Sequence, residues 1–284
     1  HQGVNLNIDG EAEKIIVDLP RSRTYGVKPD DFFTIVPKLL VKEGDKVKNG
    51  TPLFFSKKNP RINFVSPVSG IVTSIVRGPK RKILEIIVTD DKKNDSVFFE
   101  TASHEKLTLD EIKELILKSG FWPFIKQRPY GIISSPEDTP KSIFVSCFST
   151  VPLAVDYDFL LKNDKEDFQL GVNILKRLTS GDVYLGLDNS FNSFFKEIEN
   201  VKKSSVEGPH PSGNVGIQIH KIDPINYGDK VWTINPEDVS NLGAFFRTGK
   251  FSSKRTIALV GSSVKKRQYY KTCLLYTSPS PRDR

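Results

Sequence analysis

The sequence predicts a protein of mixed α/β and β class, with a β-rich first domain, an α/β domain and a smaller α+β segment. Three observations support this prediction. Short β-branched runs separated by turn signals fill residues 1–100, strands alternate with helices over residues 101–205, and a glycine- and proline-rich stretch opens residues 206–267. At 284 residues, the chain is long enough for two or more domains that each bury a core.

In the first domain, strands are expected at Lys14–Val17, Phe64–Val65, Gly70–Val76 and Ile83–Val88. The strings VKEGDKVKNGTPLFF and SPVSGIV have the spacing of biotinyl/lipoyl-type barrel-sandwich domains, with Gly44 and Gly50 expected at positive φ in tight turns. A swinging-arm carrier would need a hairpin-tip lysine beside small residues or methionine. Lys57 and Lys58 stand in the string SKKNP instead, so this domain is expected to be scaffold.

The second domain is expected to be a Rossmann-like α/β unit with a largely parallel sheet. Its first helix begins at a capping box formed by Thr108 and Glu111 and ends at Gly120. A strand at Ser142–Phe148 follows, and then a helix at Phe168–Leu178 that is closed by Gly181. A second strand at Val183–Leu187 and a further helix at Phe191–Ile198 come next.

The third segment, residues 206–267, starts with a glycine- and proline-rich stretch. Apolar and polar residues then alternate, which predicts a strand that ends near Trp232. The string NPED at Asn235 is a strong helix start, since a cap residue precedes proline and two acids. This helix is expected to end at Gly249, and Arg255–Val260 is expected to be one more strand.

Two signals in this segment are weak. Gly208, Gly213 and Gly216 form a loose cluster that is not expected to follow a strand and open a helix, so a turn-rich surface loop is favoured over nucleotide binding. His210 and His220 have no companion cluster with metal-ligand spacing. His210 lies between two prolines and is expected to be structural or part of a subunit contact.

Composition excludes several classes of protein. The net charge of +8 comes from lysines scattered among acids, which disfavours nucleic acid and favours a generally lysine-rich surface. Two cysteines, Cys147 and Cys273, cannot build the usual four-cysteine iron–sulfur site and fit a reducing compartment. No apolar run approaches the roughly 18 to 20 residues that a transmembrane span needs, and no signal peptide is recognisable.

The two ends of the sequence are unusual. No methionine occurs, not even at position 1, so the sequence is expected to begin inside a reading frame. The final string CLLYTSPSPRDR lacks apolar periodicity and resembles translated sequencing adapter. Residues 268–284 are therefore expected to be a non-native tail outside the fold, with the native C-terminal region missing.

Ten strings stand in an order that chance would not produce: GVNLNIDG, VKEGDKV, SKKNP, PVSG, RGPKRK, GFWPFIKQRPYG, SIFVSCFSTVPLA, VEGPHPSGNVGIQIHKIDP, VWTINPEDV and FRTGKF. From about Gly3 to Val264, the chain resembles the A subunits of the sodium-translocating NADH:quinone reductases. The resemblance implies a component, inactive alone, of a translocase that couples NADH oxidation and ubiquinone reduction to Na⁺ export. It implies other subunits and ubiquinone or menaquinone as partners, at the cytoplasmic face of a bacterial inner membrane.

That family is distantly similar to the flavin-binding subunit of respiratory complex I, in which a glycine-rich loop follows the first helix. Here residues 120–129 read GFWPFIKQRP, where bulky side chains would block a phosphate and prolines remove N–H donors. The resemblance therefore implies that this chain holds no cofactor, whereas the complex uses NADH, flavins, an iron–sulfur centre and quinone. No catalytic and no metal-binding residue is expected.

A quinone headgroup needs a flat apolar slot with hydrogen-bond donors at its carbonyl oxygens. The segment 121–130 interleaves aromatic rings with donors, and the first domain extends the slot if it folds back. The quinone-binding residues expected from this reasoning are Phe121, Trp122, Phe124, Arg128, Tyr130 and Phe33. The alternative is that these aromatics bury the junction between the two domains.

Three rival functions remain open at this point. An electron-transport subunit of the Rnf type would carry cysteine-rich ferredoxin motifs and a glycine-rich flavin loop. A biotin or lipoyl carrier would carry a modified lysine. A free-standing oxidoreductase would bind NADH by itself.

Overall fold

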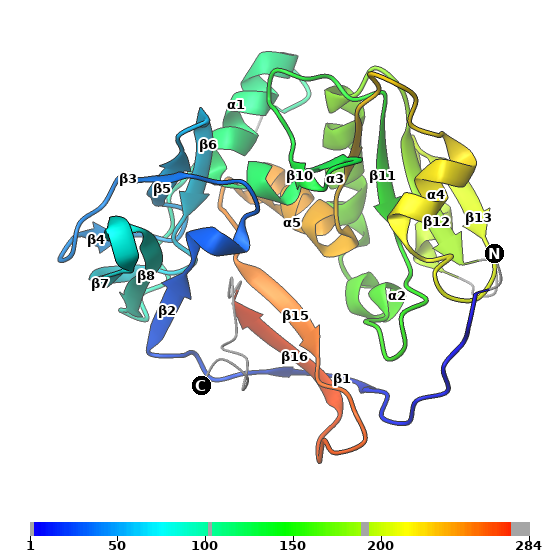
Figure 1. Cartoon of the computed structure of the whole chain (residues 1–284), viewed down its shortest axis with the longest axis horizontal. Coiled ribbons are helices and arrows are strands. Elements are labelled where there is room, and N and C mark those ends of the chain that lie inside the picture. The colour runs from blue at the N-terminus through cyan, green and yellow to red at the C-terminus, as the bar shows by residue number, and fades with distance from the viewer. Residues whose placement is uncertain (1–2, 102–103, 189–192, 274–284) are drawn as a thin grey trace.

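The computed structural model describes residues 3–101, 104–188 and 193–273. Figure 1 shows a β-rich first domain beside an α/β domain, with a small three-stranded sheet next to both. In the described ranges, no helix combines the length and the apolar character that a membrane span requires.

The first domain is built from two antiparallel sheets. One has the strand order β2 (Thr24–Val27), β8 (Ile83–Asp90), β7 (Gly70–Arg77) and β4 (Lys46–Val47); the other has the order β3 (Pro37–Leu39), β5 (Pro52–Ser56) and β6 (Asn59–Val65). Phe54 stacks on Phe64 in the core, with ring centroids 4.6 Å apart. Gly44 and Gly50 have φ of 91° and 90°, which confirms the two predicted turns. Two 3₁₀ turns, η1 (Pro29–Asp31) and η2 (Pro79–Arg81), complete the domain.

The α/β domain contains one six-stranded sheet. Its strand order is β10 (Ile132–Ile133), β9 (Lys126–Arg128), β14 (Val231–Thr233), β11 (Ser142–Ser146), β12 (Val183–Asp188) and β13 (Lys202–Val206). The four strands from β14 to β13 are parallel, and β9 and β10 add an antiparallel edge. The predicted, largely parallel sheet is confirmed.

Helix α1 (Leu109–Ser119) begins and ends where the sequence predicts. The Glu111 amide donates to the Thr108 hydroxyl at 3.3 Å, and the Glu111 carboxylate accepts from the Thr108 amide at 2.7 Å. Gly120 ends the helix with φ of 85°. The short turn η3 (Trp122–Phe124) then leads into β9.

Helices cover both faces of the sheet. Helices α3 (Lys165–Leu178) and α5 (Pro236–Thr248) pack on one face, and α4 (Val215–Ile222) packs on the other, against Phe144 and Val231. Helix α2 (Tyr157–Leu161) follows β11. A Cβ at Gly243 of α5 would lie 1.7 Å from the Asp167 carbonyl oxygen, so this glycine permits the close contact of α5 with α3.

Three predicted elements need correction. The helix over Phe168–Leu178 ends at Leu178 as predicted, with Thr179 and not Gly181 as its C-cap. The helix over Phe191–Ile198 is only the 3₁₀ turn η4 (Phe194–Glu197), with Phe191 outside the described residues. The stretch before Trp232 forms α4 rather than an alternating strand. Residues 206–251 are not a separate α+β segment, because β14 lies inside the six-stranded sheet and α5 packs on α3.

The third sheet joins distant parts of the chain. Strand β1 (Glu13–Asp18) pairs in parallel with β16 (Gln268–Cys273), which also pairs with β15 (Lys254–Ala258). Tyr269 in β16 is buried, which corrects the expectation that the fold stops before Gln268. Residues 274–284 lie outside the described residues, and a non-native origin for the tail stays a prediction.

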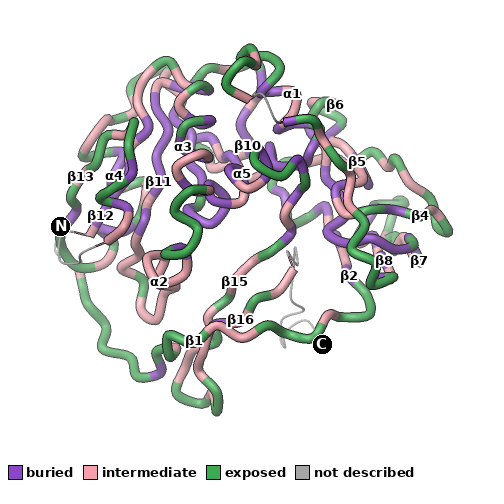
Figure 2. The backbone as a smooth tube through the Cα atoms, turned by 180° about the vertical axis from the view of Figure 1, so that it is seen from behind, coloured by how far each residue is buried: buried purple, intermediate pink, exposed green. Residues whose placement is uncertain are grey.

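Burial is uneven across these parts. Figure 2 shows that burial concentrates in the six-stranded sheet and its helices, whereas the segment before β1 and the loop between β15 and β16 are mostly exposed. The α/β domain therefore provides the rigid frame on which loops at the strand ends are positioned.

Candidate functional site

Phe121 and Trp122, two of the six predicted quinone contacts, lie in the core. The indole of Trp122 is fully buried, packs edge-on against Trp232 with centroids 5.6 Å apart, and donates to the Ser134 carbonyl at 2.8 Å. Phe121 packs against Phe251 with centroids 4.8 Å apart. The ring partners of both residues, Phe245, Phe251 and Trp232 among them, belong to the α/β domain and not to the first domain.

The other four predicted contacts are distributed more widely. Phe124 is half-buried and lines a cavity, Arg128 is half-buried in β9, and Tyr130 and Phe33 are 76% and 69% exposed. The structure therefore divides the six residues among the core, a cavity and the surface, and does not gather them in one slot.

The first domain does fold back onto the segment that follows α1. The Lys126 Nζ lies 5.9 Å from the centroid of the buried Phe32 ring, and Ile35 packs against the common core. Phe33 and Val36, on the same loop, keep their side chains exposed. An apolar edge of the first domain thus lies next to the start of β9.

The backbone of residues 120–129 offers few donors to a phosphate. The amides of Phe121, Phe124 and Ile125 already donate to the carbonyls of residues 116, 121 and 122. Pro123 and Pro129 have no N–H. The absence of a flavin site in residues 120–129 stays a prediction.

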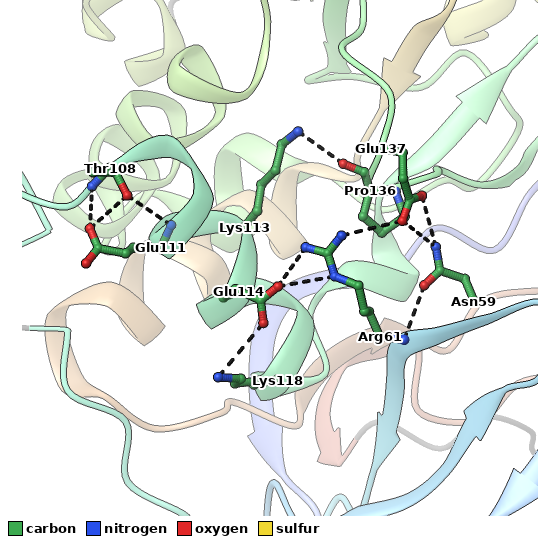
Figure 3. A network of polar contacts seen from close by, with 9 residues as sticks. All are labelled: Asn59, Arg61, Thr108, Glu111, Lys113, Glu114, Lys118, Pro136 and Glu137. Carbon is green, nitrogen blue, oxygen red and sulfur yellow. Dashed lines mark hydrogen bonds and ion pairs between the residues drawn. The ribbon is translucent and has the colours of Figure 1, made fainter.

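The hairpin that carries Lys57 and Lys58 is tied to the α/β domain, as Figure 3 shows. The Arg61 guanidinium bonds Glu114 of α1 at 2.6 Å and Glu137 at 3.4 Å, and the Asn59 amide also donates to Glu137. This clamp, defined as Asn59, Arg61, Glu114 and Glu137, fixes the hairpin next to the second domain. A swinging arm needs a free hairpin tip, so the clamp disfavours a carrier role.

The loop of residues 207–214 contradicts the prediction made for its glycine cluster. It follows β13 directly and opens α4, which is the strand–loop–helix arrangement that the sequence pattern disfavoured. We call these residues the β13–α4 loop. Its position at the carboxyl end of a parallel sheet is where α/β proteins bind ligands.

Hydroxyl groups hold this loop against the end of β11. The Thr150 hydroxyl accepts from the Gly213 amide at 3.0 Å, and the Ser146 hydroxyl donates to the Gly213 carbonyl at 3.0 Å. A Cβ at Gly213 would lie 2.6 Å from the Thr150 nitrogen, so only glycine fits this close approach. The sequence carried one signal of this arrangement: a run of serine and threonine directly after a buried strand.

A cavity of about 360 Å³ opens beside the loop, at the carboxyl ends of β11 and β14. The order of the strands reverses between these two, since β12 and β13 continue on one side of β11 and β14 lies on the other. We call it the switch cavity. Its lining includes Phe124, Lys126, Ser149, Gly213, Val215, Thr233, Asn235 and Asp238.

Four charged side chains determine the electrostatics of the switch cavity. Burial lowers the pKa of the Lys126 amine, and the carboxylate of Asp238 opposes that effect. Burial raises the pKa of Asp238 and Glu237, although both carboxylates are bound by Arg255, at 2.6 Å and 3.1 Å. The single positive charge of Arg255 offsets only one of these two carboxylates, and the Lys126 ammonium is a further cation whose charge acts on Asp238.

A larger cavity of about 910 Å³ lies between the N-terminal segment and the loop after β11. Leu6, Ile8 and Val151 line it, and Lys14 and Asp156 form an ion pair at 2.6 Å at its edge. Burial raises the pKa of the Cys147 thiol, which keeps this sulfur in its unreactive form.

His210 makes two polar contacts within the chain. Its ring contacts the Thr150 hydroxyl at 3.2 Å, and its carbonyl accepts from the Val4 amide. His220 is exposed on α4. Within residues 3–101, 104–188 and 193–273, no three His, Cys, Asp or Glu side chains gather as a metal-binding group.

Two family models match the chain. The NqrA N-terminal barrel-sandwich hybrid domain matches residues 1–101, and the NqrA second alpha/beta domain matches residues 107–251. The second match includes β13, α4, β14 and α5, in agreement with a single α/β domain.

Curated relatives that bear the name of the A subunit of Na(+)-translocating NADH-quinone reductase are similar over most of this chain. Those of Neisseria meningitidis serogroup A, Glaesserella parasuis and Photorhabdus laumondii are 36%, 35% and 34% identical. Each alignment covers 96% of this chain, which spans about 62% of the length of the relatives. Among solved structures, an NAD⁺-reducing [NiFe]-hydrogenase is similar at a TM-score of 0.41 and 13% identity, over 58% of this chain and 37% of that one, too low to establish a common fold.

Proposed function

This chain belongs to the NqrA family, and on that premise we propose that it acts as the NqrA component of a Na⁺-translocating NADH-quinone reductase. In this proposal, the other subunits supply NADH oxidation and Na⁺ export, and this chain helps to form the quinone end of the complex. It attaches through those subunits to the cytoplasmic face of the inner membrane. Expression with its partner subunits followed by membrane fractionation tests the location, because a chain found only in the supernatant would contradict it.

The observation that carries the quinone proposal is the contact between the two domains at β9. The loop of residues 32–36 lies against Lys126 and leaves Phe33 exposed, and the β9–β10 turn leaves Tyr130 exposed. An exposed aromatic ring such as Tyr130, two residues after the donor Arg128, is suited to contact a quinone ring and its carbonyl oxygens. Phe121 and Trp122 then support the site from the core.

The proposal includes that this chain alone holds no flavin and does not oxidise NADH. The occupied amides of Phe121, Phe124 and Ile125 support it. Absorbance of the purified chain, with an NADH oxidation assay, is the test. A yellow protein with one flavin per chain, or turnover of NADH, would contradict this part.

The quinone role is best tested by substitution of the exposed aromatics, because their removal spares the core. Phe33→Ala and Tyr130→Ala are made in the assembled complex, with Phe98→Ala and Tyr227→Ala as controls of similarly high exposure, 68% and 109%. A binding role predicts a raised KM for quinone in the first pair only, with assembly and NADH oxidation unchanged. If all four variants show wild-type quinone kinetics, the site lies elsewhere.

A further inference from the structure

Lys126 is a half-buried cation without a counter-ion at hydrogen-bond distance. Its amine lines the switch cavity and, within the described residues, forms no hydrogen bond and no ion pair. It contacts the Phe32 ring instead, 5.9 Å from the ring centroid. Lys141, on the same domain, pairs with Asp223 at 2.6 Å and Asp229 at 3.3 Å. A buried, unpaired ammonium costs free energy unless an anion compensates it.

Thr233 presents a second free donor in the same cavity. It is 7% exposed, lines the switch cavity, and its hydroxyl has no hydrogen-bond partner in the part of the chain that the structure describes. Thr233 is paired with Lys126 across β14 and β9, so both side chains stand on one face of the sheet. The ammonium and the hydroxyl therefore converge on one space.

Helices α4 and α5 both begin at this cavity. They differ in whether their first backbone amides have hydrogen-bond acceptors. In α5, Pro236 has no N–H and the Glu237 amide donates to Asn235 at 3.0 Å. In α4, the Asn214 side chain does not cap the helix, and among described residues the Val215 amide has no acceptor. Val215 lines the cavity, so the amide end of α4, with its partial positive charge, is open to it.

The acidic side chain at this cavity does not occupy these donors. Asp238 is bonded to Arg255 at 2.6 Å and forms no ion pair with the Lys126 amine. Three groups at the cavity remain free to donate to a ligand: the Lys126 ammonium, the Thr233 hydroxyl, which can also accept, and the Val215 amide.

We propose that the switch cavity binds a small molecule through its phosphate or carboxylate group, held by Lys126, Thr233 and the N-terminus of α4. The volume of about 360 Å³ is within the range of small-molecule sites, which is about 300 to 1,000 Å³. The lowered pKa of the buried Lys126 amine is in accord, since a bound anion would stabilise the ammonium and raise this pKa. The anion proposal does not depend on the quinone contacts Phe33 and Tyr130, although the two regions meet at Lys126, which contacts the Phe32 ring.

The test is a calorimetric titration of the chain with two probes, inorganic phosphate and succinate. Lys126→Gln removes the charge, Lys126→Arg keeps it, and Thr233→Val removes only the hydroxyl. Lys118→Gln, a change at an exposed lysine of α1, is the matched control. Circular dichroism confirms that each variant is folded before its titration.

We expect one probe to bind with 1:1 stoichiometry, and the stronger probe identifies the anionic group. Lys126→Gln is expected to weaken binding by about tenfold or more, and Thr233→Val by about fivefold, while Lys126→Arg and Lys118→Gln stay within about threefold. If neither probe binds at 10 mM, the proposal is overturned, because a Kd of roughly 10 mM is the weakest expected of such a specific site. Equal affinity of folded Lys126→Gln and the wild-type chain would overturn it as well.

Discussion

The Lys57–Lys58 hairpin and the β13–α4 loop both have sequences that resemble known motifs. In both cases the structure is the opposite of what that resemblance suggests. The hairpin resembles a carrier tip, yet the clamp on Arg61 and Asn59 fixes its flank to the α/β domain. The loop resembles a surface turn, yet it opens α4 beside the switch cavity. What distinguishes them is the environment of their donors. Those of the hairpin flank are satisfied by carboxylates, whereas donors beside the loop remain free.

The largest expected effect on stability comes from Arg255, which binds Glu237 and Asp238 beside the switch cavity. Arg255→Gln leaves Glu237 and Asp238 buried without their cation, which costs about 3 to 5 kcal/mol of stability. Urea unfolding at pH 7 measures it. Arg267→Gln, which loses only a contact with the exposed Asp9, is the control and should cost less than about 1 kcal/mol.

The same variant has a predictable pH dependence. Burial raises the pKa of Glu237 and Asp238, so above the ordinary carboxyl pKa the folded state keeps protons that the unfolded chain has lost. Stability therefore falls as pH rises through that window. Without Arg255 these pKa values rise further, so the deficit of the variant should be smaller at pH 4 than at pH 7. A deficit independent of pH would contradict this account.

The next largest effect on stability distinguishes Gly213 in the β13–α4 loop from Gly216 in α4. In Gly213→Ala, the new methyl group would meet the Thr150 nitrogen at 2.6 Å, and overpacking costs about 1 to 3 kcal/mol. In Gly216→Ala nothing lies within 4 Å, and alanine in a helix is favoured by up to about 1 kcal/mol. Thermal unfolding should thus shift in opposite directions. Equal shifts would show that the loop does not hold Gly213 closely.

A smaller effect is expected at the clamp. A double-mutant cycle with Arg61→Gln and Glu114→Gln should give a coupling of about 0.2 to 1 kcal/mol, because both side chains are partly exposed. The coupling should decline as salt is raised. A coupling near zero at low salt would mean that the domains are held by apolar packing alone.

The smallest effect is expected at the hairpin tip. Lys57→Ala and Lys58→Ala should each change stability by less than about 0.5 kcal/mol. In the protein isolated from its native host, a proteolytic peptide that contains Lys57 and Lys58 should have the mass of the unmodified sequence. A mass increase located on Lys57 or Lys58 would restore the carrier alternative.

The sequence predicted elements whose signals are local. The capping box at Thr108, the glycine after α1 and the start of α5 at Asn235 depend on neighbouring residues and were all confirmed. Helix α4 was missed because Val215, Ile217 and Ile219 alternate as in a strand, whereas the helix buries Gln218 next to Ile219.

The candidate site was only partly predictable. Lys126 lies within the segment 121–130, which the sequence analysis selected for its aromatic rings and donors without naming this residue. Its partner Thr233 is set by strand register across more than 100 residues of sequence. Periodicity gives no access to such register. The same holds for Phe121 and Trp122, whose burial depends on Phe251 and Trp232 from distant elements.

The parallel pairing of β1 with β16 has a consequence for synthesis on the ribosome. Glu13 pairs with Gln268, so β1 emerges long before its partner. At about 5 to 20 residues per second, the delay is roughly 10 to 50 s. During this time the first domain and much of the α/β domain can fold, while β1 remains an unpaired strand. Its charged ends, Glu13, Lys14 and Asp18, are suited to discourage pairing with other nascent chains until β16 arrives.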